Sequence, residues 1–154
     1  MSVPKSVVRF RKDGVEYTSR VDFASYTILE LTRAALRDVG KFIARTANTA
    51  AMTLPGLKKS RRVRGRTSTF LYNVPWAKTG LPHLEVGVTH DTWYGVAQEL
   101  GNSGQPKRQI LRRSAQDNIA KIIEIESKYL SALEDEARAL SLIDEAEYSG
   151  GDDD

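Results

Sequence analysis

The chain has 154 residues, no cysteine, two histidines and a formal net charge of +3. This length suits one domain with a modest core, and the absence of cysteine excludes disulfides, thiol chemistry and cysteine-ligated zinc. No run of about 18 apolar residues is present, and the start of the chain has no apolar core, so we expect neither a membrane span nor a secretion signal.

The net charge hides a strong asymmetry along the chain. From Glu134 to the end there are nine acids and one arginine, so this segment carries −8 and the first 133 residues carry +11. The sequence therefore predicts a basic body followed by an acidic tail. A basic body suits polyanions such as DNA, or an acidic protein surface.

The first predicted elements are a β-hairpin and a long helix. Residues 7–21 alternate apolar and polar side chains around a turn at 12–14, where Gly14 can take a positive φ. Residues 26–52 repeat apolar side chains at three- and four-residue steps, which predicts an amphipathic helix, with Asp22 or Ser25 as its N-cap. The Pro55-Gly56 pair ends it.

A basic segment follows, which we predict to be a flexible loop over residues 57–69. Six cations fall within nine residues of it, and no acid lies among them. Like charges so close together repel and favour a solvated loop. The loop could contact DNA phosphates or an acidic partner, or it could simply keep the protein soluble. The six residues are Lys58, Lys59, Arg61, Arg62, Arg64 and Arg66.

The second half of the chain predicts short strands and another long helix. Residues 70–74 and 84–88 read as strands, and residues 93–100 as a third strand or a short helix. Residues 101–106 form a loop by composition. An apolar face that includes Ile119, Ile123, Leu130 and Leu133 predicts one helix over 111–140.

These elements predict an α+β fold, with two long helices packed on a small, mostly antiparallel sheet. We expect a single domain over residues 1–146, followed by a disordered acidic tail over 147–154. The tail could pair with a neighbour's basic loop, compete with DNA for its own loop, or only solvate the protein.

No motif in the sequence assembles a catalytic or cofactor site. His90 and Asp91 lie near Glu85 and Glu99 in sequence, so an acid–base pair can be imagined, but a solvated turn is the much better explanation. Residues 101–104 lack the Gly-Lys-Ser/Thr of a phosphate loop, and metal ligands are few. We therefore expect no enzyme activity, no cofactor and no metal.

A second group of cations opens the last predicted helix. Lys107, Arg108, Arg112 and Arg113 lie at the end of the helix where the dipole favours anions. An acidic partner would explain this placement, and so would simple tolerance of a small local cost.

Two stretches of the sequence resemble a family of small tailed-phage proteins. They are YGVAQELGN (94–102) and PKRQILRRS (106–114). The family's members are variously called neck, head–tail joining or tail-completion proteins. Their pattern is a tyrosine, a Glu-aromatic-Gly-Thr step, a variable loop, and a Pro-Ala-Arg-Pro-Phe-Leu-Arg-Pro-Ala run. The matching residues are Tyr94, Glu99, Gly101, Pro106, Arg108, Leu111 and Arg112.

Several positions depart from the family's pattern, and the match covers only a short part of the chain. Leu100 replaces the aromatic residue, Asn102 the threonine, and Ile110 the phenylalanine, while Gln109 and Arg113 replace prolines. Gly101 would end a strand and let the chain change direction. We expect Glu99 to pair with Arg108 or Arg112, within or between subunits.

The resemblance implies a structural virion protein in the neck or upper tail. Such a protein would form a ring of about six copies or a multiple, through heterologous contacts. Its partners would be the connector or stopper and the tail terminator or tube, with genomic DNA in the channel. It would assemble in the host cytoplasm, without a membrane. The implied subunit interface comprises Glu99, Arg108, Arg112 and Arg113.

Two other classes of function stay open. A nucleic-acid-binding module outside any virion would use the basic loop, with binding that falls steeply as salt rises. A small nuclease would need clustered carboxylates to hold metal, and the basic body holds few.

Overall fold

The computed structural model describes residues 8–12, 14–53, 70–75, 81–88, 94–104 and 106–149. Within these residues the protein is mostly helical, with two small antiparallel sheets of two strands each, which makes the fold α+β. The predicted basic loop and residues 150–154 lie outside this set, so the predicted flexibility of both stays a prediction.

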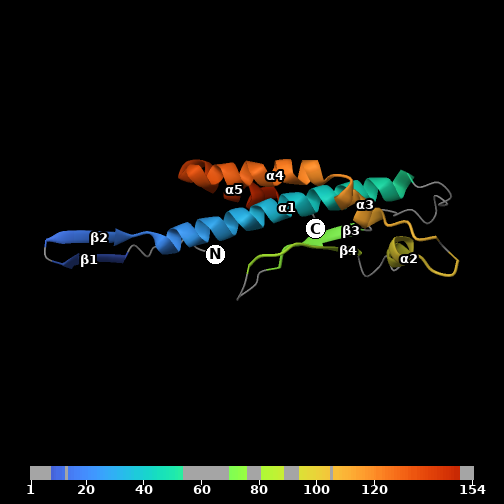
Figure 1. Ribbon diagram of the computed structural model, residues 1–154, viewed down its shortest axis with the longest axis horizontal. Helices are drawn as coiled ribbons and strands as arrows, with labels where there is room; N and C mark the ends of the chain where they lie inside the picture. Colours follow the sequence, from blue (N-terminus) through green and yellow to red (C-terminus); the bar gives the residue numbers. More distant parts are fainter. Residues whose placement is uncertain are drawn as a thin grey trace.

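The predicted N-terminal hairpin is confirmed. Strands β1 (Val8–Lys12) and β2 (Val15–Ser19) pair antiparallel, with Phe10 opposite Tyr17. Gly14 has a φ of 80°, as a tight turn between the strands requires. Figure 1 shows the hairpin continuing past the N-terminal end of the first helix, away from the other elements.

The central element is the helix α1 (Val21–Thr53), whose 33 residues span about 50 Å. The predicted helix is confirmed, but the predicted N-caps are wrong. Asp22 and Ser25 lie inside the helix, and the carbonyl of Arg20 accepts the first hydrogen bond, from the N–H of Ala24 at 3.0 Å. The helix therefore starts directly after the hairpin.

Strands β3 (Phe70–Asn73) and β4 (Glu85–Val88) form the second antiparallel hairpin and pack on α1. Asn48 of α1 holds the first residue of β3 from both sides. Its Oδ1 accepts from the N–H of Phe70 at 3.0 Å, and its Nδ2 donates to the carbonyl of Phe70 at 2.9 Å. A Cβ at Gly40 would lie 2.7 Å from side-chain atoms of Tyr72 and Leu84, so glycine permits this close approach.

The prediction of one continuous helix over residues 111–140 is wrong. The structure has α3 (Ile110–Gln116), α4 (Ile119–Ser131), a short 3-10 turn η3 (Ala132–Glu134) and α5 (Glu136–Ser149). Asp135 is extended, and its Oδ1 accepts hydrogen bonds from the N–H groups of Ala137 and Arg138, which start α5 anew. α5 continues to Ser149, which includes the first residues of the predicted tail.

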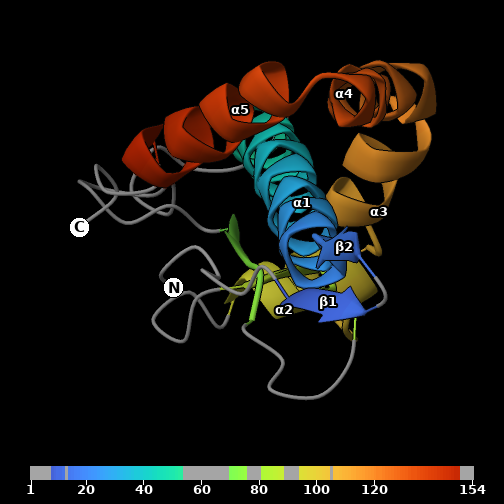
Figure 2. The same ribbon diagram turned by 90° about the vertical axis from the view of Figure 1, so that its left-hand side faces the viewer.

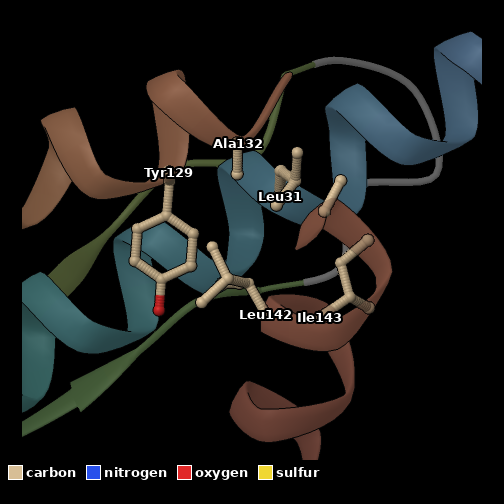
Figure 3. Packing of buried hydrophobic residues seen from close by; sticks show 7 residues of the cluster. Leu31, Tyr129, Ala132, Leu142 and Ile143 are labelled. Carbon is tan, nitrogen blue, oxygen red and sulfur yellow. The ribbon is translucent and has the colours of Figure 1, made fainter. Parts of the chain in front are cut away.

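The helices α4 and α5 pack on one side of α1, and the β3–β4 hairpin lies on the other side (Figure 2). The predicted packing of two long helices on one sheet is therefore wrong. The helices α4 and α5 instead bury their apolar residues against α1. Leu31 of α1 meets Tyr129 of α4, Ala132 of η3, and Leu142 and Ile143 of α5 in this core (Figure 3).

A second, smaller core lies toward the C-terminal end of α1. Ala47 of α1, Phe70 of β3 and Ile110 of α3 are buried together there, and Phe70 is fully inaccessible to solvent. This core fixes where α3 begins, and it thereby positions the residues that carry the family resemblance.

Candidate assembly site

Five of the seven matching residues of the phage-like signature, Glu99, Gly101, Arg108, Leu111 and Arg112, lie in one local unit between α2 (Tyr94–Leu100) and α3. The Glu99 carboxylate accepts hydrogen bonds from the backbone N–H groups of Leu111 at 2.8 Å and Arg112 at 3.1 Å. Amides in the first turn of a helix have no partner within the helix, and the positive end of the helix dipole attracts an anion. Glu99 therefore caps α3 from a neighbouring element.

Backbone contacts close the chain between the two helices. The N–H of Arg108 donates to the carbonyl of Gln98 at 2.9 Å, and the N–H of Gln109 donates to the carbonyl of Glu99 at 3.3 Å. Together with the Glu99 cap, these bonds hold residues 98–99 against residues 108–112. We call this arrangement the Glu99 clamp.

Gly101 makes the clamp possible. Its φ is 77°, and a Cβ at this position would lie 2.9 Å from the backbone nitrogen of Lys107. Its N–H donates to the carbonyl of Ala97 at 2.9 Å, which closes the C-terminus of α2. Residues 93–100 were expected to form either a strand or a short helix, and they form the helix α2. The expectation that Gly101 ends a strand is therefore wrong.

The expected side-chain pair between Glu99 and Arg108 or Arg112 does not form within one subunit. Among the described residues, no ion pair joins these side chains, and the two Glu99 oxygens accept main-chain N–H groups. The guanidinium of Arg112 is exposed at the surface. A pair between subunits stays a prediction.

Exposed cations and apolar side chains surround the clamp. Lys107, Arg112 and Arg113 are exposed and Arg108 is half-buried, and none of them forms an ion pair with another residue of the described ranges. The side chain of Leu100, at the end of α2, is 65% exposed. We call this region the basic end; it comprises Val96, Leu100, Lys107, Arg108, Arg112 and Arg113.

An apolar groove lies between α1 and α4, some distance from the clamp. It encloses about 260 Å³. Ile28, Leu130 and Leu133 line it while 51%, 65% and 45% exposed. The sequence placed Leu130 and Leu133 on the apolar face of the predicted helix, but Tyr129 and Ala132 of the same segment occupy the contact with α1 and α5. The apolar stripe of α4 is wider than its partners cover.

A polar contact holds α4 to α1 beside this groove. The hydroxyl of Tyr129 donates a hydrogen bond to Oδ2 of Asp38. Burial raises the pKa of the Tyr129 hydroxyl well above its ordinary value, and the bond to the Asp38 carboxylate raises it further. Lys128 lies over the Tyr129 ring, 5.6 Å from its centre. This arrangement holds α4 against α1.

Of the other candidate residues, only His83 and Glu85 lie in the part of the chain that the structure describes, and they form no larger site there. His83 and Glu85 are exposed neighbours at 3.3 Å, whereas His90 and Asp91 lie outside the described residues. Among the described ranges, no three acidic or histidine side chains are placed to hold a metal ion. The six cations of residues 58–66, predicted to contact DNA or a partner, also lie outside them.

Within the described ranges, no helix is both long and apolar enough to cross a membrane. The sequence matches no protein-family model and no curated protein, and the structure matches no solved structure.

Proposed function

We propose that this protein is a structural component of a long-tailed phage, which forms a ring in the neck or upper tail and joins or completes the head–tail connection around the DNA. The ring would contact the connector or stopper on one side and the tail terminator or tube on the other. No chemical step is needed for this role.

The Glu99 clamp is the observation that carries the proposal. Among the signature residues, Glu99, Gly101, Arg108, Leu111 and Arg112 all take part in it. The clamp requires the residue type at two of these positions: Glu99 supplies the acceptor carboxylate, and Gly101 takes the positive φ, whereas Arg108, Leu111 and Arg112 contribute main-chain N–H groups. The clamp therefore supports the view that the likeness reflects a shared local structure.

The exposed apolar groove is a second support. A groove lined by side chains such as Ile28, Leu130 and Leu133 is unfavourable in water and gains free energy when a partner covers it. A protein whose role is to contact other subunits needs such a surface, whereas a nucleic-acid-binding module acting alone does not.

The alternative is a nucleic-acid-binding module outside any virion, and the exposed cations of the basic end favour it. Lys107, Arg112 and Arg113 are placed in solvent, where they could contact phosphates. Such a protein would stay monomeric and would bind DNA with an affinity that falls steeply between low and moderate salt.

Electron microscopy of lysates tests the proposal. The phage that carries this gene would be given a stop codon in it. The proposal expects DNA-filled heads separate from finished tails, or tails of abnormal length. Intact virions in normal number would overturn it and favour the nucleic-acid-binding alternative.

A further inference from the structure

The described part of the protein separates its charges in space. Residues 106–116 carry four cations and no acid, and most of them flank the Glu99 clamp. Residues 132–145 carry five carboxylates and one arginine, and all five acidic residues are exposed. These two segments therefore have charges of equal size and opposite sign.

The two charged segments lie at opposite ends of α4. The helix α3 precedes α4 and η3 follows it, and α4 has 13 residues, a length of about 20 Å. Figure 1 shows α3 beside the C-terminal part of α1, and the start of α5 at the far end of α4. A separation of this size exceeds the screening length at physiological salt, about 8 Å, so the two ends act as separate surfaces.

Each end also presents apolar side chains. Val96 and Leu100 are exposed at the basic end. Leu130 and Leu133 are exposed beside the acids Glu134, Asp135 and Glu136. We call the second region the acidic end; it comprises Leu130, Leu133, Glu134, Asp135 and Glu136. Both surfaces thus combine exposed apolar residues with charges of one sign, so each can meet a surface of the opposite charge.

We propose that the partner of the basic end is the acidic end of a second copy of this chain. Opposite charges steer the two surfaces together, and the apolar residues of both are then removed from water. The inference rests on the proposed function for its biological setting. It deepens that function by naming the two surfaces that join neighbouring subunits.

The charges also select the symmetry of the contact. A two-fold contact brings the same patch of both copies together, so basic would face basic or acidic would face acidic, and the like charges would repel. A contact between different patches avoids this repulsion. Such head-to-tail contacts close into a ring when the rotation between subunits permits.

The cations closest to the acidic end are engaged locally or outnumbered. Lys128 lies over the ring of Tyr129, 5.6 Å from its centre. Arg138 is the one arginine among residues 132–145. The acidic end therefore keeps a net negative charge for a partner.

Charge reversal at each end tests the inference. One variant carries Arg112→Glu and Arg113→Glu, a second carries Glu134→Arg and Glu136→Arg, and a third carries all four changes. Asp135 is left in place because its carboxylate caps α5. Arg45→Glu, at an exposed position of α1 outside both ends, is the control for a change of charge alone.

Each variant would be supplied in trans to the phage with the stop codon, and plaques counted. We expect each single-end variant to lose at least ~100-fold in plaques, because its copies repel one another. The four-site variant, and the two single-end variants together, should recover most of this loss. Single-end variants that complement like the wild type, or a four-site variant as defective as they are, would overturn the inference. Normal virions without the gene would instead overturn the proposed function.

A cross-linking measurement gives an answer that does not depend on plaques. The chain has no cysteine, so Arg112→Cys and Glu134→Cys can be introduced together and joined with a bismaleimide, in virions and in concentrated protein. Head-to-tail contacts yield a ladder of covalent oligomers from the double variant and only monomer from either single variant. Dimers from a single variant, or no ladder in either sample, would contradict the inference.

Discussion

The Glu99 carboxylate on α2 accepts a hydrogen bond of 2.8 Å from the backbone N–H of Leu111, twelve residues further along the chain. This bond joins the end of one short helix to the start of the next. Gly101 follows Glu99 by two residues and takes a positive φ, which turns the chain after α2. This turn brings the start of α3 to the Glu99 side chain.

Glu99→Ala should destabilise the protein. The change leaves the N–H groups of Leu111 and Arg112 without their acceptor, and the loss of such a cap costs about 1–2 kcal/mol. Glu99→Gln keeps one acceptor oxygen and should lose less. Urea unfolding followed by circular dichroism measures both. Glu124→Ala, at an exposed position, is the control and should change the free energy of unfolding by less than about 0.5 kcal/mol. An equal effect of the Glu99 and Glu124 changes would show that the clamp does not stabilise the fold.

Gly101→Ala should be more harmful than the same change elsewhere. The added methyl group would meet the backbone of Lys107 at a φ of 77°, so we expect a loss of at least about 1 kcal/mol. Gly87→Ala is the matched control, because no atom lies within 4 Å of its Cβ position. Thermal unfolding of the two variants compares them. A Gly101 variant as stable as the Gly87 variant would contradict the described geometry of the clamp.

The Tyr129 hydroxyl should make stability depend on pH in the alkaline range. Its pKa is raised in the folded protein, so the neutral form is favoured by folding. The resulting stability is fully present below the ordinary tyrosine pKa of about 10 and is lost as the pH rises above it. Tyr129→Phe should lower the free energy of unfolding at pH 8, since the Asp38 carboxylate loses its donor. The same change should reduce the further fall in the free energy of unfolding between pH 8 and pH 11. Unfolding at pH 8 and pH 11 measures both effects, and equal pH dependence in the two proteins would contradict the prediction.

The double change Leu130→Ser and Leu133→Ser should impair assembly while leaving the stability of the fold almost unchanged. Both side chains are largely exposed, so their loss should change the free energy of unfolding by less than about 1 kcal/mol. The apolar groove would nevertheless lose its rim, and plaque formation in the complementation assay should fall. Leu31→Ser is the contrast, because this buried residue should be needed for folding itself. Normal plaque numbers with the exposed pair changed would exclude the groove from assembly.

The sequence predicts the elements whose signals are local. The alternation in residues 7–21, and the apolar stripe of residues 26–52, correspond to the hairpin and to α1. The breaks in the last helix were missed because the apolar spacing continues through them. Asp135 was the available signal, since an aspartate followed by a new amphipathic turn is an N-cap candidate.

The candidate site was predictable in its members but not in its contacts. The sequence singled out Glu99, Gly101 and Arg112 within one short stretch, and all three take part in the Glu99 clamp. It assigned Glu99 to a guanidinium because residue types suggest side-chain partners, whereas main-chain N–H groups carry no sequence signal. The exposed groove could not be predicted, since periodicity shows which face of α4 is apolar but not how much of it α1 and α5 cover.

Labelling of intact virions tests the central claim most directly. A short tag placed after Asp154 would be marked with gold particles and located by electron microscopy. We predict label at the joint between head and tail, in particles that remain infectious. Label on the capsid shell, or virions that contain none of the protein, would contradict the account.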